Sequence, residues 1–174
     1  MATLNIRPTA PADIPAITRI YAHAVTHGTA TFELEPPDEA EMLRRFDRLR
    51  AGPFPYVVAE IDGAVAGYAY AALFRERPAY RFTVEDSIYI APQMHRRGIG
   101  RALLTRLIAD SETAGFRQMI AVIGDSRQAA SIAVHRACGF KDAGVFEAVG
   151  FKFGRWLDTV QMQRALGEGS GTAP

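Results

Sequence analysis

The chain has 174 residues, 48% of them hydrophobic, and a formal net charge of +1 at pH 7. This length suits a single domain with a substantial core. The near-neutral charge argues against a dedicated nucleic-acid-binding protein, which would carry a concentrated basic face. Cys138 is the only cysteine, so an intrachain disulfide and a thiolate metal cluster are excluded. We therefore expect no metal site and a reducing, cytoplasmic location.

The chain shows no pattern typical of a membrane protein. Glu60 and Asp62 interrupt its longest apolar run, which is too short to span a bilayer. The N-terminal residues lack the basic and then apolar segments of a secretory signal. At the other end a glycine-rich stretch predicts a flexible tail over 167–174, after one domain that spans 1–166.

The first predicted elements are a short strand over residues 4–7 and a helix. Apolar residues on one face predict the helix, namely Ile14, Ile17, Ile20, Tyr21 and Ala24. A loop over 26–37 follows, without helical periodicity and with two prolines at its end. It carries Phe32, and such a polar loop is typical of a structural connection and of a binding loop alike.

A second helix and a hairpin come next. Asp38 is a favourable N-cap, and Glu41 has the spacing of a capping-box partner, so a helix is predicted from here to Gly52. Residues 56–61 and 64–74 read as two strands joined by Asp62-Gly63, a strong hairpin turn.

The centre of the chain is a strand, a loop and a helix. β-Branched and aromatic residues predict a strand from Val84 to Ile90, which Pro92 ends. Apolar residues at helical spacing predict a helix that runs to Gly115. The loop between them reads Arg-Arg-Gly-Ile-Gly-Arg over 96–101.

The C-terminal part adds a buried strand over 118–123, a helix over 128–138, and a closing pair of strands over 145–149 and 156–162. Strands and helices thus follow in the order β-α-α-β-β-β-α-β-α-β-β. This order predicts an α/β domain with a mixed sheet.

The loop over 96–101 suits a pyrophosphate group. Its glycines let the backbone approach a ligand, and the helix that follows presents unpaired N–H groups at its positive end. The three arginines add charge-assisted hydrogen bonds. The loop is neither a Walker loop, because no Gly-Lys-Ser/Thr follows, nor a complete dinucleotide fingerprint, because the third glycine is missing.

Glu85 is the candidate general base. On the predicted strand, residues 85, 87 and 89 share one face, and 84, 86, 88 and 90 share the other. A carboxylate inside a strand is costly to bury unless it is paired, so a salt bridge is the alternative role. Beside an acyl-donor site, the carboxylate would remove the proton that keeps an ammonium from attacking.

Ser131 and His135 lie four residues apart and therefore on one face of the predicted helix. Packing or surface roles are the alternatives for both. A nucleophilic pair is disfavoured, because no strained nucleophile turn surrounds Ser131.

Three arginines alternate with aromatic residues just before the central strand: Phe74, Arg75, Arg77, Tyr80, Arg81 and Phe82. They could form a solvated loop. An arginine fork also binds carboxylate, phosphinate or sulfonyl-type oxygens, and neighbouring aromatics would shape a pocket. The aromatic stretch over 149–156 reads either as a plain hairpin or as part of that pocket.

The strand, the loop over 96–101 and the helix after it resemble the acetyl-CoA motif of the GNAT superfamily of N-acetyltransferases. Adding FRERPAYRFTVEDSIYI (74–90), ASIAVHRACGF (130–140) and VGFKFGRWLD (149–158), the chain resembles the phosphinothricin and methionine sulfoximine acetyltransferase branch from Ile6 to Met162. The resemblance implies the GNAT fold, a mixed, mostly antiparallel twisted sheet flanked by helices. It also implies acetyl-CoA as co-substrate, a small amino-acid-like acceptor and a homodimer.

The resemblance also implies roles for single residues. Glu85 would be the general base, and His135 would lie near the sulfur. The residues implied to bind the cofactor are Ile88, Tyr89, Ile90, Arg96, Arg97, Gly98, Ile99, Gly100, Arg101, Gln128 and Ser131. The residues implied to bind the acceptor, besides Glu85, are Phe32, Phe74, Arg75, Arg77, Tyr80, Arg81, Thr83, Lys152 and Phe153.

Two other functions compete with this hypothesis. The first is acetylation of another amine, such as a polyamine, an aminoglycoside or a protein N-terminus. A polyamine or aminoglycoside pocket needs an acidic lining, which the arginines over 75–81 argue against. The second is a non-catalytic acyl-CoA-binding module, because fold alone does not determine function. Retention of Glu85 together with His135 favours an enzyme.

Overall fold

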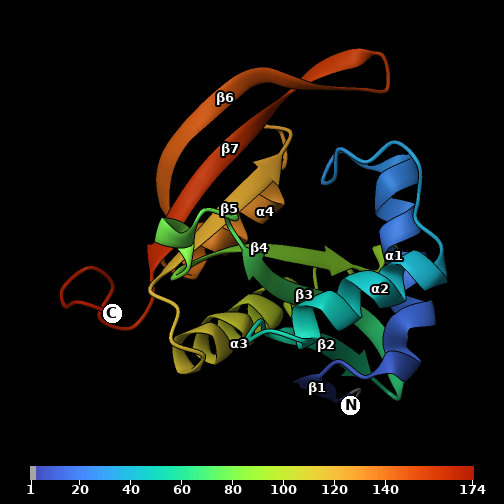
Figure 1. The fold of residues 1–174 in the computed structure, drawn as a ribbon. Coiled ribbons are helices and arrows are strands. Elements are labelled where there is room, and N and C mark those ends of the chain that lie inside the picture. Colours follow the sequence, from blue (N-terminus) through green and yellow to red (C-terminus); the bar gives the residue numbers. More distant parts are fainter. Residues whose placement is uncertain (1–2) are drawn as a thin grey trace.

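The computed structural model describes residues 3–174 and contains a seven-stranded mixed sheet (Figure 1). Its strands are β1 (Leu4–Pro8), β2 (Tyr56–Ile61), β3 (Ala64–Leu73), β4 (Thr83–Ile90), β5 (Gln118–Gly124), β6 (Lys141–Lys152) and β7 (Arg155–Ala165). In space they follow the order β1-β2-β3-β4-β5-β7-β6. Only β4 and β5 run parallel, and the other neighbours are antiparallel. The predicted mixed, mostly antiparallel sheet is therefore confirmed.

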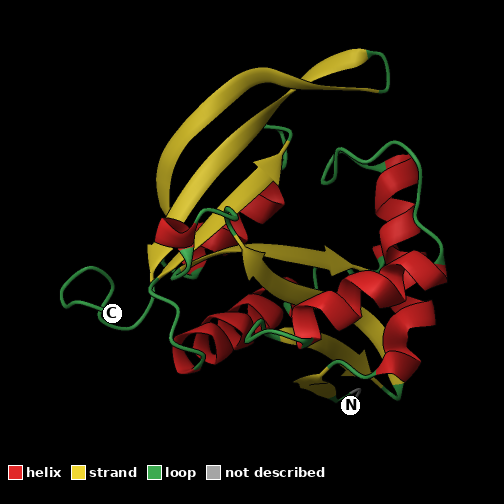
Figure 2. Ribbon diagram, in the orientation of Figure 1, coloured by secondary structure: helices red, strands yellow, loops and turns green. Residues whose placement is uncertain are grey.

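Helices cover both faces of the sheet (Figure 2). They are α1 (Ile14–His27), α2 (Glu39–Arg50), α3 (Ile99–Thr113) and α4 (Ala129–Ala137). Tyr68 of β3 is buried against α1 and α2, whereas its neighbour Ala69 belongs to the core beneath α3 and α4. Alternation along the strands thus divides the core into two layers, as period-2 side chains require.

Several local predictions hold because their causes are local. Asp62 and Gly63 both have positive φ, at 50° and 79°, and turn β2 into β3. Asp38 caps α2 by accepting from the Glu41 backbone N–H at 2.8 Å. The predicted reciprocal bond from the Glu41 side chain is not the one observed, because that carboxylate accepts from Arg44 and Arg45 instead.

The closing strands are longer than the sequence predicts. The predicted strands over 145–149 and 156–162 are parts of β6 and β7, which run from Lys141 to Lys152 and from Arg155 to Ala165. Glycines 144 and 150 look like strand ends in the sequence. Here they lie at irregularities of the pairing, between Asp142 and Gly144 and between Phe146 and Gly150, and the strand continues past them.

β4 and β5 are paired over only part of their length. Their pairing runs from Thr83 with Gln118 to Asp86 with Ala121 and stops there, although both strands continue. On its opposite edge β5 pairs with β7 as far as Gly124. The sheet therefore opens between its two central parallel strands, where backbone groups of both are free of each other.

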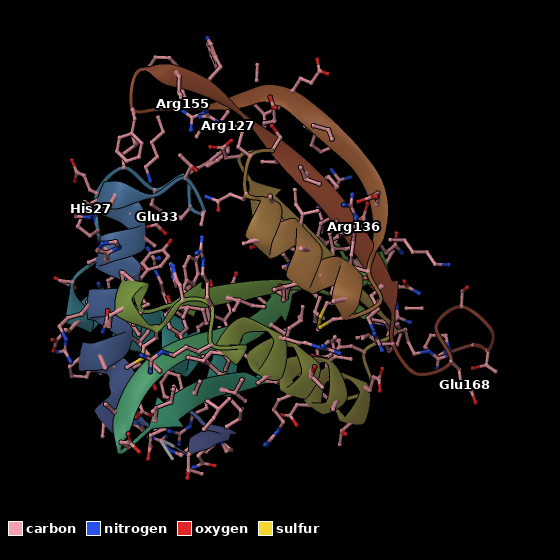
Figure 3. The ribbon with its side chains drawn as sticks, turned by 180° about the vertical axis from the view of Figure 1, so that it is seen from behind. His27, Glu33, Arg127, Arg136, Arg155 and Glu168 are labelled. Carbon is pink, nitrogen blue, oxygen red and sulfur yellow. The ribbon has the colours of Figure 1, made fainter. Side chains whose placement is uncertain are left out.

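A buried carboxylate ties the β6–β7 hairpin to the body of the domain. Figure 1 shows this hairpin arching over the loop between α1 and α2. Asp125 accepts from Thr29 of that loop at 2.9 Å, from Arg155 of β7 at 2.6 Å and from the backbone of Arg127 at 3.1 Å. Figure 3 shows Arg155 and Arg127 next to each other beneath the hairpin. Burial alone would raise the pKa of Asp125, but these hydrogen bonds hold it below its usual range.

A second contact reinforces this connection. Lys152, at the end of β6, is only 4% exposed and donates from Nζ to the Thr31 carbonyl at 2.9 Å. Burial lowers the pKa of this lysine. The Phe32 ring lies against Gly124 and Gly150, where a Cβ at either position would collide with it. The loop between α1 and α2 is therefore held between β5 and β6.

The residues after β7 fold back in turns. Arg117 donates to the carbonyls of Gly169 and Thr172, at 2.8 and 3.0 Å. Glu168 accepts from the Thr172 hydroxyl at 2.8 Å. The division into a domain over 1–166 and a flexible tail over 167–174 stays a prediction.

Asp125→Asn should loosen this connection. Losing a charged acceptor costs about 1.5–3 kcal/mol of unfolding free energy, which urea unfolding measures. Hydrogen exchange of the amides over 28–33 should accelerate, because Thr29 loses its partner. Since the pKa of Asp125 is lowered on folding, its contribution is present at neutral pH and disappears on acidification. The difference in unfolding free energy between the variant and the wild type should thus decrease below about pH 4.

Asp47→Asn, on the exposed side of α2, is the matched control and should change neither measurement. Equal exchange over 28–33 in the Asp125 variant and the wild type would contradict the connecting role of Asp125.

Candidate active site

A small cavity lies at the opening between β4 and β5. It measures about 70 Å³. Its walls come from β4, β5, α4 and the α1–α2 loop: Ala30, Asp86, Ser87, Ile88, Tyr89, Ala121, Val122, Ile123, Gly124, Gln128, Ser131 and His135. Four of the residues predicted to bind the cofactor therefore meet here, together with the predicted catalytic histidine.

His135 is paired with a carboxylate on the central strand. Its Nε2 lies 3.0 Å from Asp86 Oδ2, and its Nδ1 lies 2.7 Å from the Ser131 carbonyl oxygen. The Ser131 hydroxyl is farther from Nδ1, at 3.5 Å. Since a carbonyl only accepts, Nδ1 carries a proton and cannot act as a base toward Ser131. The geometry agrees with the sequence argument against a nucleophilic Ser–His pair.

Glu85 lies on the opposite face of β4 from this pair. It is half-buried on the α1–α2 side, in pairing register with Ala72 of β3. Burial and, to a smaller extent, the nearby Asp86 charge raise the pKa of Glu85, Arg75 acts in the opposite direction, and the net pKa is about 7. A carboxylate with this pKa exchanges protons readily at neutral pH, which is what general-base catalysis requires.

The loop over 96–101 has the backbone that an anion site needs. Arg96 and Gly98 adopt positive φ, at 63° and 76°, and α3 begins directly after Gly98. The Arg96 and Arg97 side chains are exposed. Ile99 is buried in the core, so it can reach a ligand only through its amide. The N–H groups of the first turn of α3 thus point outward beside two arginines.

A groove of about 570 Å³ continues from this loop along α3, lined by Gly98, Arg101, Ala102, Thr105, Arg106 and Ala109. Ile88 and Tyr89, near the end of β4 that leads into this loop, line the smaller cavity. Ile90 does not line it, and its carbonyl lies 3.2 Å from His95 Nε2. Predicted cofactor residues therefore line both spaces: Gly98 and Arg101 the α3 groove, and Ile88, Tyr89, Gln128 and Ser131 the cavity at the β4–β5 opening.

The three arginines of 75–81 do not act alike. Arg75 is close enough to Glu85 to affect its pKa, and it stacks over Phe74 at 5.0 Å. Arg81 stacks over Phe82 at 4.5 Å and donates to the Pro78 carbonyl of its own turn at 3.2 Å. Arg77 is exposed. Only Arg75 is thus placed next to the candidate base.

The other predicted acceptor residues fall into two groups. Tyr80 packs edge-on against Phe74, 5.8 Å between ring centres, and Thr83 begins β4. Phe32 and Lys152 are occupied in fastening the α1–α2 loop. Phe153 is 57% exposed, and Lys152 lies over its ring at 5.1 Å. Of this second group, Phe32 and Lys152 hold the α1–α2 loop, which contributes Ala30 to the cavity wall.

Sequence reasoning missed Asp86 and Asp125. The strand pattern places Asp86 on the face opposite Glu85, where a buried carboxylate needs a partner. His135, on the predicted helix over 128–138, could have been predicted as that partner. No local pattern marks Asp125, because its partners lie at Thr29 and Arg155. Within residues 3–174 no cluster of three His, Cys, Asp or Glu side chains is arranged to hold a metal ion. Nor is any helix of this part of the chain long and apolar enough to cross a bilayer.

The sequence of this chain is similar to those of several known proteins. Residues 17–140 match the sequence profile of the Acetyltransferase (GNAT) family. A phosphinothricin N-acetyltransferase of Alcaligenes faecalis is 56% identical over 162 residues, covering 93% of this chain and 82% of that protein. An L-methionine sulfoximine/L-methionine sulfone acetyltransferase of Salmonella typhimurium is 39% identical over 165 residues, covering 95% and 96%.

The fold has an equally similar relative. A crystal structure of a GNAT superfamily phosphinothricin acetyltransferase from Sinorhizobium meliloti, in complex with acetyl-CoA, matches with a TM-score of 0.95 and 54% sequence identity, covering 99% of this chain and 92% of that one. The expected GNAT fold and the expected resemblance to this branch are thereby confirmed. Profile, fold and near full-length relatives agree, and the chain belongs to the GNAT family of acetyltransferases.

Proposed function

We propose that this protein transfers the acetyl group of acetyl-CoA to the α-amine of a small amino acid with a tetrahedral phosphorus or sulfur group, such as phosphinothricin, methionine sulfoximine or methionine sulfone. One observation carries the proposal: the sheet opens between β4 and β5 with Glu85 on one face and His135 on the other. A thioester in the opening would meet a base from one side and a proton donor from the other. In this proposal the enzyme is cytoplasmic, where Cys138 stays reduced.

The donor would follow the path from α3 to the opening. The α3 N-terminus with Arg96 and Arg97 would bind the pyrophosphate. The free backbone edge of β4, at Ile88 and Ile90, would pair with the pantetheine amides. The cavity lined by Gln128, Ser131 and His135 would then receive the thioester. The relative from Sinorhizobium meliloti, a complex with acetyl-CoA, supports this role for the fold.

The acceptor would lie on the α1–α2 side, against Glu85. Arg75 next to Glu85 would bind the oxygen-rich end of the acceptor, and the base would face its amine. Glu85 would take a proton from the ammonium, directly or through water. The free amine would attack the thioester carbon in a ternary complex, forming the C–N bond as the C–S bond breaks. Phe74, Tyr80 and the wall held by Phe32 and Lys152 would enclose the side chain.

The acceptor class is tested by thiol release from acetyl-CoA with a panel of amines. The thioether of methionine accepts hydrogen bonds poorly and would leave donors of the site unpaired, at a cost of roughly 1–3 kcal/mol for each donor. We therefore expect kcat/KM for methionine sulfone and sulfoximine to exceed that for methionine by about 10–100-fold per unpaired donor. Arg75→Ala should narrow this ratio. Arg81→Ala, whose guanidinium donates within its own turn, is the matched control. A higher kcat/KM for spermidine or kanamycin than for methionine sulfoximine would refute the proposal.

Glu85→Gln keeps the shape of the side chain and removes the proton acceptor. We expect kcat to fall by about 10²–10⁴-fold. Wild-type kcat should rise with pH through about 7, because Glu85 must be ionised, and the variant should lack this limb. Glu76→Gln, an exposed neighbour, is the control. A Glu85 variant with normal kcat and an unaltered pH profile leaves Glu85 a structural residue.

Replacing Arg96 and Arg97 together by Ala should raise the KM for acetyl-CoA at least tenfold and change kcat less. Each charge-assisted hydrogen bond is worth about 1.5–3 kcal/mol, and about 1.4 kcal/mol is tenfold in affinity. Arg19 and Arg48, both exposed, provide a control pair with the same loss of charge. Unchanged acetyl-CoA binding in calorimetry would rule out this loop as the pyrophosphate site.

We also propose a homodimer formed through the β6–β7 hairpin. This hairpin exposes large apolar side chains: Val145, Phe146, Val149, Phe151, Phe153 and Trp156. Trp156 is 64% and Phe146 57% exposed. Such a concentration of exposed apolar residues is typical of an interface, and a stable one buries about 1,200–2,000 Å² in total.

Light scattering at micromolar concentration should give twice the 19.0 kDa mass of the chain. Phe151→Glu with Trp156→Glu should give the single-chain mass, because each buries a charge in the interface. Leu34→Glu changes an equally exposed apolar residue outside the hairpin and should leave the dimer intact. A wild-type protein of single-chain mass would disprove the dimer.

A further inference from the structure

The Asp86–His135 pair is almost completely buried. The side chains are 3% and 5% exposed, and Nε2 lies 3.0 Å from Oδ2. The other carboxylate oxygen, Asp86 Oδ1, is also buried and has no hydrogen-bond partner within the described residues. Burying a carboxylate in this way is costly unless a charge of opposite sign compensates it.

Both ring nitrogens of His135 face acceptors. Nδ1 lies 2.7 Å from the Ser131 carbonyl oxygen, which can only accept. The neutral ring would therefore keep its proton on Nδ1 and direct the Nε2 lone pair at the Asp86 carboxylate. That arrangement is repulsive, whereas a doubly protonated ring donates to both partners. The alternative is a protonated Asp86 that donates to a neutral ring.

The surroundings favour the charged ring. His135 lies in the last turn of α4, where the helix dipole stabilises a cation. From β4, Asp86 faces the ring directly and Glu85 lies on the other side of the strand. From β5 the cavity walls are Ala121, Val122, Ile123 and Gly124, none of which titrates.

Two further groups near the C-terminal end of α4 contact Cys138 rather than the imidazole. The Thr105 hydroxyl of α3 lies 4.0 Å from the Cys138 thiol. Arg164 of β7 donates to the Cys138 carbonyl. Phe140 packs edge-on against the imidazole at 5.1 Å. Burial acts to lower the pKa of His135, but the Asp86 hydrogen bond and charge raise it overall.

We propose that Asp86 is a positioning residue that holds His135 as a buried imidazolium beside the thioester cavity. The inference rests on the proposed function and extends it to the departure of the sulfur. When the amine attacks, the C–N bond forms, the C–S bond breaks and the electron pair stays on sulfur. The Nε2 proton of His135 passes to that sulfur and gives the thiol.

The proton balance closes through the acceptor nitrogen. An ammonium loses two protons in becoming the amide. One reaches the solvent through Glu85, and the other replaces the proton that His135 donated. Reprotonation of His135 at Nε2 is favourable, because it replaces the repulsion between the Nε2 lone pair and the Asp86 carboxylate by a hydrogen bond. Asp86 touches neither reactant in this scheme and acts through His135.

Asp86→Asn tests the proposal, because it keeps an acceptor for Nε2 and removes the charge. The kcat profile should be bell-shaped, with Glu85 ionised on its acid limb and His135 protonated on its alkaline limb. The Asp86 charge raises the pKa of both groups. The variant should therefore shift both limbs to lower pH, the alkaline limb by about one unit. A loss of activity with both limbs in place overturns the proposal.

Two control variants isolate the pair. Asp142→Asn removes an equal charge from an exposed ion pair with Arg136, next to His135 in the sequence, and should leave both limbs in place. A His135→Asn variant should lack the alkaline limb, and adding Asp86→Asn to it should shift only the acid limb. An alkaline limb that persists without His135 and still shifts with Asp86→Asn would show that another group is responsible and would overturn the proposal.

Nitrogen NMR of the His135 ring gives a readout in the wild type alone. At neutral pH we expect both ring nitrogens in the protonated range, and in Asp86→Asn a titration at least about one unit lower. A neutral wild-type ring, with the shared proton on Asp86, overturns the proposal. This measurement needs neither acetyl-CoA nor an acceptor, so it decides the Asp86–His135 charge state even where the proposed acceptor proves wrong.

Discussion

The structure depends on the divergence of β4 and β5 after four paired residues. A continuous sheet would separate the α1–α2 side from the α3–α4 side by a layer of backbone. Because the two parallel strands part beyond Asp86 and Ala121, groups from both faces reach one small cavity. The same divergence frees the backbone edge of β4 that an extended, amide-containing ligand can pair with.

Two neighbouring carboxylates of β4 supply the negative charges near this opening. Glu85 and Asp86 are consecutive and therefore point to opposite faces. Asp86 lies within hydrogen-bond distance of His135, whereas burial and the Asp86 charge raise the pKa of Glu85 and Arg75 lowers it. One carboxylate thus pairs with a histidine ring, and its neighbour has a pKa of about 7, suited to exchanging protons. Adjacent carboxylates acquire different roles from their different surroundings.

The walls of the site are held by contacts between distant segments. Asp125 joins Thr29, Arg127 and Arg155, and Lys152 binds the Thr31 carbonyl. These buried, charge-assisted bonds fasten a loop without regular structure to the hairpin above it. They account for the burial of Asp125 and Lys152 near the opening.

The sequence by itself determined what short-range order encodes. Periodicity of two and 3.6 residues located the strands and helices, and glycines with arginines before a helix marked the anion loop. It also placed Glu85 and Asp86 on opposite faces of one strand. Only the tertiary structure decided which carboxylate His135 pairs with, 49 positions away. It also showed that Arg75 lies near Glu85 whereas Arg81 donates within its own turn, a difference that the sequence does not reveal. These outcomes depend on where the chain brings remote side chains together, which no local pattern records.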